Sequence, residues 1–465
     1  MKPEETKSEN KAAGLTRRDF LKTAAVAGAA AAFVGPSILH AQAKGDAINI
    51  GIIGTGTEGR VLLMNCLKIP GVRFKAVCDI WPHYRTYTAK LLGKYKQEVQ
   101  EYTDYQEMLD KEKDLDAVIV ASPDFVHAEQ TVACLKAGKH VYCEKEMSNT
   151  IEKAKEMVTT SQATKKLLQI GHQRRSNPRY HMMLDYINNK KACGRLTNVA
   201  GNWNRSKPLT NTWTDKTALD DEALKKYGYG TMERFRNWRW YKDFSGGPIA
   251  DLGSHQVDIF HWVLGTPPKS VMACGGNENY PKMEWYDNVI AIYEWDYKVD
   301  DKPGVVRGAY TLLSTTSNGG YLETFMGTEG AIIISEGLGQ GGIRREYDAP
   351  EAAWEKDLQK SMSKTDLAKA TATAPSGKPK TEEGDIKVGH SIPSPGRYYP
   401  PLPPPKEDTT EHMPHLVNFF DAIKGKAKLN CPGEVGFETA VSILRVNEAV
   451  AAGKKIEFKP EEFKV

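Results

Sequence analysis

The chain has 465 residues, which is too many for one ordinary hydrophobic core and fits two domains with additional segments. Hydrophobic residues make up 40% and charged residues 26%, proportions that are normal for soluble globular proteins. The net charge of +4 comes from interspersed acids and bases. Because neither a basic run nor zinc-type Cys/His spacing occurs, a nucleic-acid-binding protein is not expected.

The first 43 residues have the order of parts of an export signal. Twin arginines lie within Thr16–Lys22, and the alanine-rich apolar stretch Thr23–Val34 follows them. Ala41-Gln42-Ala43 then offers small residues to a signal peptidase. The pattern resembles a Tat signal cleaved near Ala43, so we expect a periplasmic or secreted protein. The apolar stretch is too short and too rich in alanine for a stable membrane span, and none is expected.

Strands and helices alternate over residues 44–173. Short apolar runs predict strands, and helical spacing of apolar residues between them predicts helices. The strands are expected at Ile48–Ile53, Phe74–Asp79, Ala117–Ala121, His140–Cys143 and Leu167–Ile170, and the helices at Gly59–Leu67, Pro82–Leu92, Tyr105–Leu109, His127–Ala137 and Thr150–Thr164. This alternation predicts a Rossmann domain with a doubly wound parallel sheet.

The pattern changes after residue 173, and residues 174–465 predict a second, α+β domain. Gly-containing turns join β-rich runs, which indicates a large, mostly antiparallel sheet. These runs are Val289–Trp295, Val305–Leu313, Tyr321–Met326 and Ala331–Ser335, and Glu434–Ala451 forms a final helix. Residues 349–410 predict a long, irregular, proline-rich insertion with one helix near Ala353–Ser363. Its polyproline stretch is either a spacer or a clasp for a neighbouring subunit.

The loop after the first strand carries the dinucleotide-binding fingerprint. Gly54, Gly56 and Gly59 follow a strand and open a helix, and Asp79 ends the next strand. Gly54 permits the tight turn, Gly56 lets a pyrophosphate approach the backbone, and Gly59 allows close packing of helix and strand. A carboxylate at Asp79 can bind both ribose hydroxyls and would repel a 2′-phosphate. NAD is therefore expected, and NADP is disfavoured.

Two later segments make the interpretation specific. They are Tyr142-Cys143-Glu144-Lys145, at the end of the fourth strand, and Gly246–Asp258, which contains an Asp-x-x-x-His pair. Together with the turn Ala121–His127, they resemble the Gfo/Idh/MocA family of sugar and polyol oxidoreductases. The resemblance covers about residues 48–335 and the last helix.

The resemblance implies a catalytic set of Lys145, Asp251 and His255. Elementary chemistry agrees, because Asp251 and His255 share one helical face and a neutral imidazole can take a proton from a hydroxyl. The Lys145 ammonium, at the carboxyl end of a strand, can stabilise an alkoxide. By the same resemblance, Ser122, Pro123, His127 and Glu144 contact the cofactor. One departure is that Glu146 replaces the proline that follows the family's lysine.

Three further residues are candidates for contact with the substrate. Arg174 and Arg175 follow the fifth strand and either bind substrate hydroxyls or pair with acids. Trp238 belongs to a tryptophan-rich stretch that serves either sugar stacking or core packing. The seven cysteines are scattered without a CxxC pair, and no metal site is expected.

These features predict an exported NAD-dependent oxidoreductase acting on a sugar or glycoside hydroxyl, with oxidation expected at C3. Free NAD is scarce outside the cytoplasm, so the cofactor is expected to be tightly bound and recycled. An alternative is a redox-neutral glycosidase that oxidises, eliminates, hydrates and reduces its substrate. A non-catalytic sugar-binding protein on the same fold is the third interpretation. The resemblance also implies a homodimer or homotetramer formed through the second domain's sheet.

Overall fold

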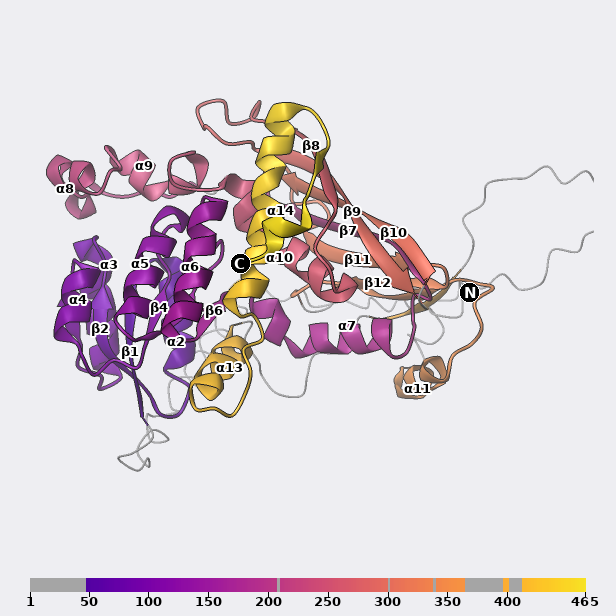
Figure 1. The fold of residues 1–465 in the computed structure, drawn as a ribbon, viewed down its shortest axis with the longest axis horizontal. Helices are drawn as coiled ribbons and strands as arrows, with labels where there is room; N and C mark the ends of the chain where they lie inside the picture. The colour runs from indigo at the N-terminus through magenta and orange to yellow at the C-terminus, as the bar shows by residue number, and fades with distance from the viewer. Residues whose placement is uncertain (1–46, 207–209, 300–301, 338–339, 364–395, 401–411) are drawn as a thin grey trace, which may run out of the picture. The chain divides into compact units, whose positions relative to one another are not determined.

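A computed structural model describes residues 47–206, 210–299, 302–337, 340–363, 396–400 and 412–465 (Figure 1). The predicted signal peptide lies outside the described residues, as do residues 364–395 and 401–411 of the predicted insertion. In the part of the chain that is described, no helix has the length and apolar character needed to cross a membrane.

The first sheet has six strands in the order β3-β2-β1-β4-β5-β6, and every pair is parallel. The strands are β1 (Ile48–Ile53), β2 (Val72–Cys78), β3 (Gln100–Tyr102), β4 (Ala117–Val120), β5 (His140–Cys143) and β6 (Leu168–Ile170). The predicted doubly wound parallel sheet is confirmed. The short strand β3 was not predicted, because two of its three residues are exposed and polar.

Helices connect these strands as the sequence predicts. They are α2 (Thr57–Cys66), α3 (Pro82–Lys94), α4 (Tyr105–Lys111), α5 (Asp124–Lys136) and α6 (Ile151–Thr164). Side-chain caps define two of the starts: Asp104 accepts from the N–H of Gln106, and Thr150 accepts from the N–H of Lys153. Helix α5 begins at Asp124, three residues before the predicted start.

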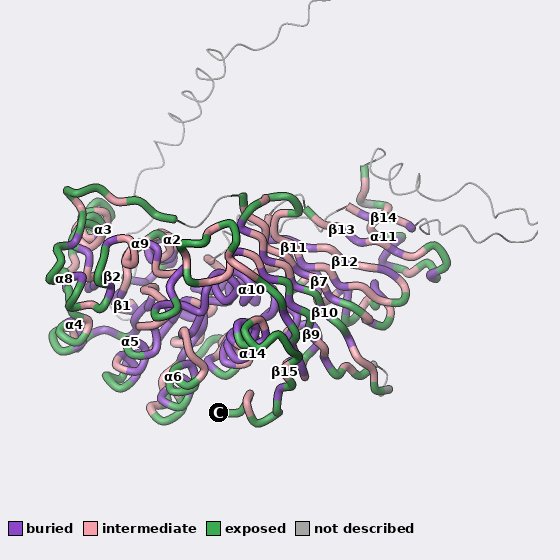
Figure 2. Tube along the Cα trace, turned by 90° about the horizontal axis from the view of Figure 1, so that it is seen from above, coloured by how far each residue is buried: buried purple, intermediate pink, exposed green. Residues whose placement is uncertain are grey.

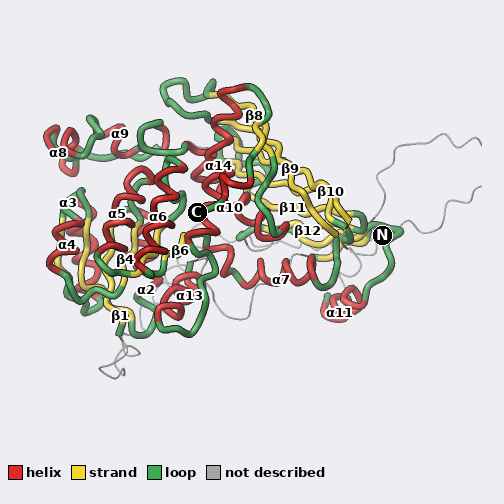
Figure 3. Tube along the Cα trace, viewed as in Figure 1, coloured by secondary structure: helices red, strands yellow, loops and turns green. Residues whose placement is uncertain are grey.

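In the described residues the second sheet has nine strands in the order β14-β13-β12-β11-β7-β10-β9-β8-β15. Figure 3 shows part of this sheet, with β8 to β12 labelled on the yellow strands. The strands are β7 (Leu196–Asn204), β8 (Ser270–Gly276), β9 (Asn288–Val299), β10 (Lys302–Leu313), β11 (Tyr321–Gly327), β12 (Gly330–Ile334), β13 (Gly342–Arg345), β14 (Arg397–Tyr399) and β15 (Ile456–Glu457). Among the strands that the structure describes, only β7 and β10 pair in parallel, so the predicted, mostly antiparallel sheet is confirmed.

One helix of this second part is buried along almost its whole length. It is α10 (Gly247–Leu264), which packs on β7 and β10 and is covered by α14 (Gly433–Ala452), as Figure 2 shows. The other helices are α7 (Pro178–Asn188), α8 (Asp221–Lys226), α9 (Met232–Arg236), α11 (Ala353–Ser361) and α13 (Met413–Ile423). Because α10 is fixed on both sides, the side chains on its first turns have little freedom.

The described ends of the predicted insertion are regular rather than irregular. Helix α11 lies where a helix was expected, and β14 pairs with β13 at the edge of the sheet. The buried carboxylate of Glu355 joins the two ends, since it pairs with Arg397 at 2.8 Å and accepts from the Tyr399 hydroxyl at 2.6 Å. The ends of the insertion are therefore part of the second domain's core.

Candidate active site

The glycine loop runs from β1 into α2. Gly54 has a positive φ of 85°, and a Cβ there would lie 2.6 Å from the backbone nitrogen of Ser122. A Cβ on Gly59 would lie 2.1 Å from the carbonyl oxygen of Gly54. A Cβ on Gly56 would meet nothing within 4 Å. The loop thus leaves open space beside the first N–H groups of α2, which fits the pyrophosphate of a dinucleotide.

Asp79 follows β2 beside this loop. One of its carboxylate oxygens accepts from the backbone N–H of Thr55 at 2.7 Å and from its hydroxyl at 2.8 Å. The other accepts from the backbone N–H of Trp81 at 2.8 Å. Burial raises the pKa of the Asp79 carboxyl, and these hydrogen bonds oppose that rise. The carboxyl group is therefore held at the rim of the loop, where an adenosine ribose would lie.

A cavity of about 1020 Å³ connects the glycine loop to α10, at the upper end of the size range of ligand pockets. Most of the predicted site residues line it: Gly54, Gly56, Asp79, Ser122, Pro123, Glu144, Lys145, Trp238, Asp251 and His255. Four others do not, namely Gly59, His127, Arg174 and Arg175.

Lys145 and Asp251, which are 106 positions apart in the chain, meet inside this cavity. The Lys145 ammonium donates to an Asp251 carboxylate oxygen at 3.0 Å and to the Asp251 carbonyl oxygen at 2.6 Å. Burial alone would lower the pKa of Lys145, but Asp251 and Glu144 outweigh it and the pKa is raised. Burial would raise the pKa of Asp251, yet Arg239 and Lys145 hold it below its usual range. Both groups are therefore charged at neutral pH.

His255 lies one helical turn beyond Asp251 and is buried at the cavity wall. Its ring lies 5.3 Å from the Trp203 ring, which in turn stacks on Tyr321 at 4.8 Å. Burial, helped by the nearby Lys145 charge, lowers the pKa of His255 well below its ordinary value. A neutral imidazole beside a charged ammonium is a suitable pair for taking a proton from a hydroxyl and stabilising the oxygen left behind.

Arg239 is a site residue that the sequence analysis missed. Its guanidinium donates to the second carboxylate oxygen of Asp251 at 3.0 Å, so Asp251 joins two cations. It also lies over the Trp238 ring, 4.2 Å from the ring centroid. The only sequence signal is its position next to Trp238, in a segment already expected to approach the pocket.

His127 has a different place from the one expected. Its ring nitrogens lie 2.7 Å from the carbonyl oxygen of Glu146 and 2.6 Å from that of Ser122. The side chain is 1% exposed. It therefore connects the loops after β4 and β5, and any effect on a cofactor passes through their backbone.

Arg174 and Arg175 pair with buried acids, which is the second of the two alternatives that the sequence left open. Arg174 pairs with Glu323 and, at 2.9 Å, with Glu336. The Nε of Arg175 lies 2.8 and 2.9 Å from the two carboxylate oxygens of Asp258. Both guanidinium groups are buried, so the ion-pair alternative describes their placement.

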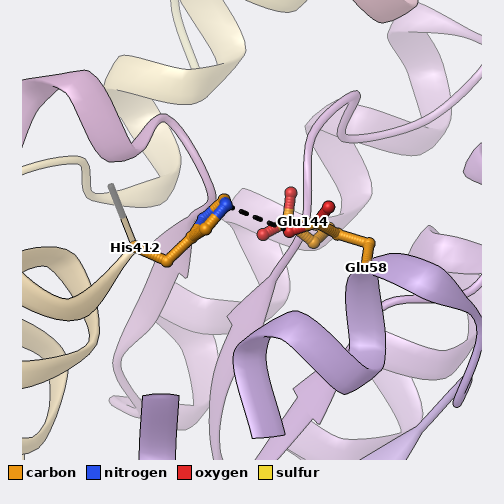
Figure 4. A group of neighbouring side chains, drawn as sticks. All are labelled: Glu58, Glu144 and His412. Carbon is orange, nitrogen blue, oxygen red and sulfur yellow. Dashed lines mark ion pairs between the residues drawn. The ribbon is translucent and has the colours of Figure 1, made fainter. Parts of the chain in front are cut away.

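A second polar group lines the cavity on the side of the glycine loop and consists of Glu58, Glu144 and His412. Figure 4 shows these three side chains turned toward one another. Its ligand atoms are within 4.8 Å of one another, and the His412 imidazole lies 3.4 Å from a Glu58 oxygen. Burial and the Glu58 charge raise the pKa of Glu144 to about 8. These three residues could hold a metal ion, although no metal was expected from the sequence. They also border the space that a cofactor at the glycine loop would use.

Glu146 stands where the resemblance leads one to expect a proline, and its side chain is completely buried. Its peptide bond with Lys145 is cis. One carboxyl oxygen accepts from the N–H of Met147 at 2.7 Å, and the other has no hydrogen-bond partner among the described residues. Burial raises the pKa of Glu146 to about 8.

Glu146→Gln is expected to flatten the dependence of stability on pH. The pKa of Glu146 is higher in the folded than in the unfolded chain. Its contribution to the free energy of unfolding is therefore complete at low pH and is lost as pH rises through about 8. Between about pH 5 and about pH 8, the free energy of unfolding of the wild type should therefore fall by up to a few kcal/mol more than that of the variant. Thermal melts across this range measure the difference. Glu152→Gln, at an exposed residue, is the control and should follow the wild type. If the stability of Glu146→Gln changes with pH in parallel with the wild type, the raised pKa of Glu146 is refuted.

Comparisons with known proteins agree with this architecture. The Gfo/Idh/MocA description "Oxidoreductase family, NAD-binding Rossmann fold" matches residues 48–172, and "Oxidoreductase family, C-terminal alpha/beta domain" matches residues 223–458. A twin-arginine translocation signal matches residues 14–34, which confirms the predicted Tat signal and points to export to the periplasm or beyond. An aldose-aldose oxidoreductase structure from Caulobacter crescentus has the same fold, with a TM-score of 0.63 and 15% identity over 89% of this chain and 100% of that one.

Two curated relatives resemble parts of the chain. Inositol 2-dehydrogenase/D-chiro-inositol 3-dehydrogenase of Shouchella clausii is 32% identical over 47% of this chain and 53% of its own length. A glycosyl hydrolase family 109 protein of Solibacter usitatus is 33% identical over 32% of this chain and 37% of its own length. The chain thus spans about half the length, or less, of these relatives. Because both family domains match, the second across about half of the residues, the chain belongs to the Gfo/Idh/MocA oxidoreductase family.

Proposed function

We propose that the mature protein is an exported, NAD-dependent oxidoreductase that oxidises a hydroxyl of a sugar or glycoside, with C3 as the expected position. The observation that carries the proposal is that Lys145, Asp251 and His255 line the same cavity as the glycine loop. On this proposal, cleavage near Ala43 removes the signal, residues 44–173 form the cofactor domain and residues 174–465 form the substrate domain.

Each residue has a distinct task in the proposed reaction. NAD supplies a hydride acceptor when bound. The neutral His255 takes the proton of the substrate hydroxyl, while the charged Lys145 stabilises the negative charge that develops on that oxygen. Asp251 holds the Lys145 ammonium in place, and Arg239 fixes the other side of that carboxylate.

NAD is favoured over NADP because the Asp79 carboxyl lies at the end of β2, where a 2′-phosphate would be repelled. Tight retention is supported by the segment that contains α8 and α9, which packs on the Rossmann domain (Figure 1). In that segment the Thr217 carbonyl accepts from the Trp81 indole, and Tyr229 packs edge-on against Phe125. Tyr227 and Tyr229 of the same segment line the cavity, and this arrangement favours a cofactor that is loaded before export and recycled.

The experiment is to purify the mature protein and record its absorbance for bound cofactor before and after adding methyl glycosides. Absorbance of reduced nicotinamide together with a keto-sugar product supports the proposed oxidation. Cofactor that dialyses away freely would contradict tight binding. If no glycoside or free sugar changes the cofactor spectrum, the proposed function fails.

A redox-neutral glycosidase is the second candidate, and Asp124 is the observation that favours it. This buried carboxyl group lines the cavity and accepts from the Ser245 hydroxyl at 3.2 Å. Burial and the nearby Asp251 charge raise its pKa to about 7, which suits a group that removes the C2 proton of a keto-sugar. Release of the aglycone without net cofactor reduction in the same experiment would establish this reaction instead.

The proposed oligomer uses the outer face of the second sheet, where Met272, Ile290 and Ile292 are 46%, 46% and 43% exposed. Met272 and Ile292 are direct partners on the neighbouring strands β8 and β9, so these side chains form one apolar patch. Replacing Ile290 and Ile292 with aspartate should convert a dimer or tetramer into smaller species. Light scattering during size exclusion measures the mass. Tyr87→Asp, at an exposed aromatic residue of α3, is the control, and an unchanged mass of the double variant would exclude this interface.

A further inference from the structure

The charges at the substrate end of the cavity do not balance. Lys145 and Arg239 each bind one oxygen of Asp251, so a single carboxylate already serves two cations. The guanidinium of Arg205 lines the same end of the cavity and makes no hydrogen bond or ion pair with any residue that the structure describes. This end therefore holds three positive groups around one carboxylate.

The other acids nearby already have partners. Glu336 binds the Arg174 guanidinium at 2.9 Å, a cation that it shares with Glu323, and burial raises the pKa of Glu323 to about 7. Asp124 accepts from the Ser245 hydroxyl, and its pKa of about 7 leaves it partly uncharged at neutral pH. Neither acid compensates Arg205.

The backbone and an aromatic ring hold Arg205 in its place. Its N–H donates to the carbonyl oxygen of Leu313 at 2.8 Å, directly after the end of β7. Trp203 and Arg205 are two positions apart and so point to the same face of the sheet. The guanidinium lies over the Trp203 ring, 5.1 Å from its centroid, and that ring also contacts His255. Arg205 thus faces the space in front of the proposed catalytic base.

A partly buried guanidinium without a bound counter-ion of its own is costly, and burial lowers the pKa of Arg205 although the Asp251 charge opposes that fall. Its planar fork matches a carboxylate in two parallel hydrogen bonds. One uncompensated positive group also matches one negative charge better than the higher charge of a phosphate.

We propose that the sugar oxidised at this site carries a carboxylate, as in a uronic acid or its glycoside, and that Arg205 pairs with that carboxylate. The inference rests on the proposed function and names its substrate class. It assigns Arg205 to substrate selection rather than to hydride transfer.

The test compares methyl β-D-glucuronide, methyl β-D-glucoside and glucose 6-phosphate as reductants of the bound cofactor in the full mature protein. Wild type should prefer the glucuronide over the glucoside by about tenfold or more in kcat/KM, and Arg205→Gln should reduce that preference by about tenfold. The exposed Arg73→Gln is the matched control and should keep the preference. Equal use of the glucuronide and the glucoside, or a preference for the phosphate, overturns the inference.

Calorimetric titration of D-glucuronate and D-glucose into the NAD-loaded protein separates this inference from the proposed function. Glucuronate binding that depends on Arg205, without any hydride transfer, would sink the proposed oxidation and support the carboxylate site. If glucosides transfer hydride to the cofactor but Arg205→Gln leaves the preference between glucuronide and glucoside unchanged, the proposed oxidation is supported and the carboxylate site is overturned. Absence of both binding and transfer would overturn both.

Discussion

Replacing Lys145 with methionine is expected to slow hydride transfer by about a thousandfold while the cofactor stays bound. The Lys145 side chain is 12% exposed, and its ammonium is held by both the side chain and the carbonyl of Asp251, so no neighbouring group takes its place. The glycine loop and Asp79 are expected to bind most of the cofactor, whereas the hydrogen-bond partners of Lys145 in the described residues are Glu144 and Asp251. Single-turnover reduction of the bound cofactor by its sugar measures the rate, and absorbance after dialysis measures cofactor content.

The exposed lysine of α5 provides the matched control for this variant. Lys136→Met removes an ammonium from the surface of the same domain and should leave the rate within about twofold of wild type. His255→Asn should also lose most of the activity, because the neutral base is absent. Loss of NAD from Lys145→Met would mean that Lys145 holds the cofactor rather than the developing negative charge.

Local patterns were enough to predict the glycine loop and the strand that leads to Asp79. Gly54 and Gly59 are required by contacts within a few residues of the turn or with the adjacent strand, and the apolar runs of the parallel strands are continuous. Asp251 and His255 share a helical face by their spacing alone. The placement of Lys145 opposite them followed from the family resemblance, because no local pattern brings together the loop after β5 and helix α10.

The remaining site residues depend on tertiary packing that the sequence does not display. Arg239 reaches Asp251 only because its short segment lies against the start of α10. His412 follows a long insertion and reaches Glu58 from the other end of the chain. From the sequence, Arg174 could either bind substrate or pair with acids. The sequence does not decide between these roles, because its partners Glu323 and Glu336 are about 150 and 160 positions away.

Arg174→Met is the second large effect, and it is expected on stability rather than on substrate affinity. The guanidinium is 1% exposed and pairs with Glu323 and Glu336, while the Tyr180 hydroxyl donates to Glu323 at 2.8 Å. Removing it leaves two buried carboxyl groups without a counter-ion, which costs about 3–5 kcal/mol. Denaturant unfolding of the variant measures this loss, and Arg307→Met, which removes an exposed ion pair with Glu294, should cost less than about 1 kcal/mol.

The loss should depend on pH in a direction that identifies its cause. Burial already raises the pKa of Glu323 to about 7 against the opposing effect of Arg174, so without Arg174 its pKa rises further. A carboxyl group whose pKa is raised by folding contributes stability at low pH that is lost as pH rises, so the Arg174→Met penalty should be smaller near about pH 5 than near about pH 8. Adding Glu323→Gln to Arg174→Met should recover part of the stability at the higher pH. Only a buried counter-ion couples the loss of stability in Arg174→Met to the protonation of Glu323. A variant that stays stable at both pH values but binds its sugar weakly would instead place Arg174 in substrate binding.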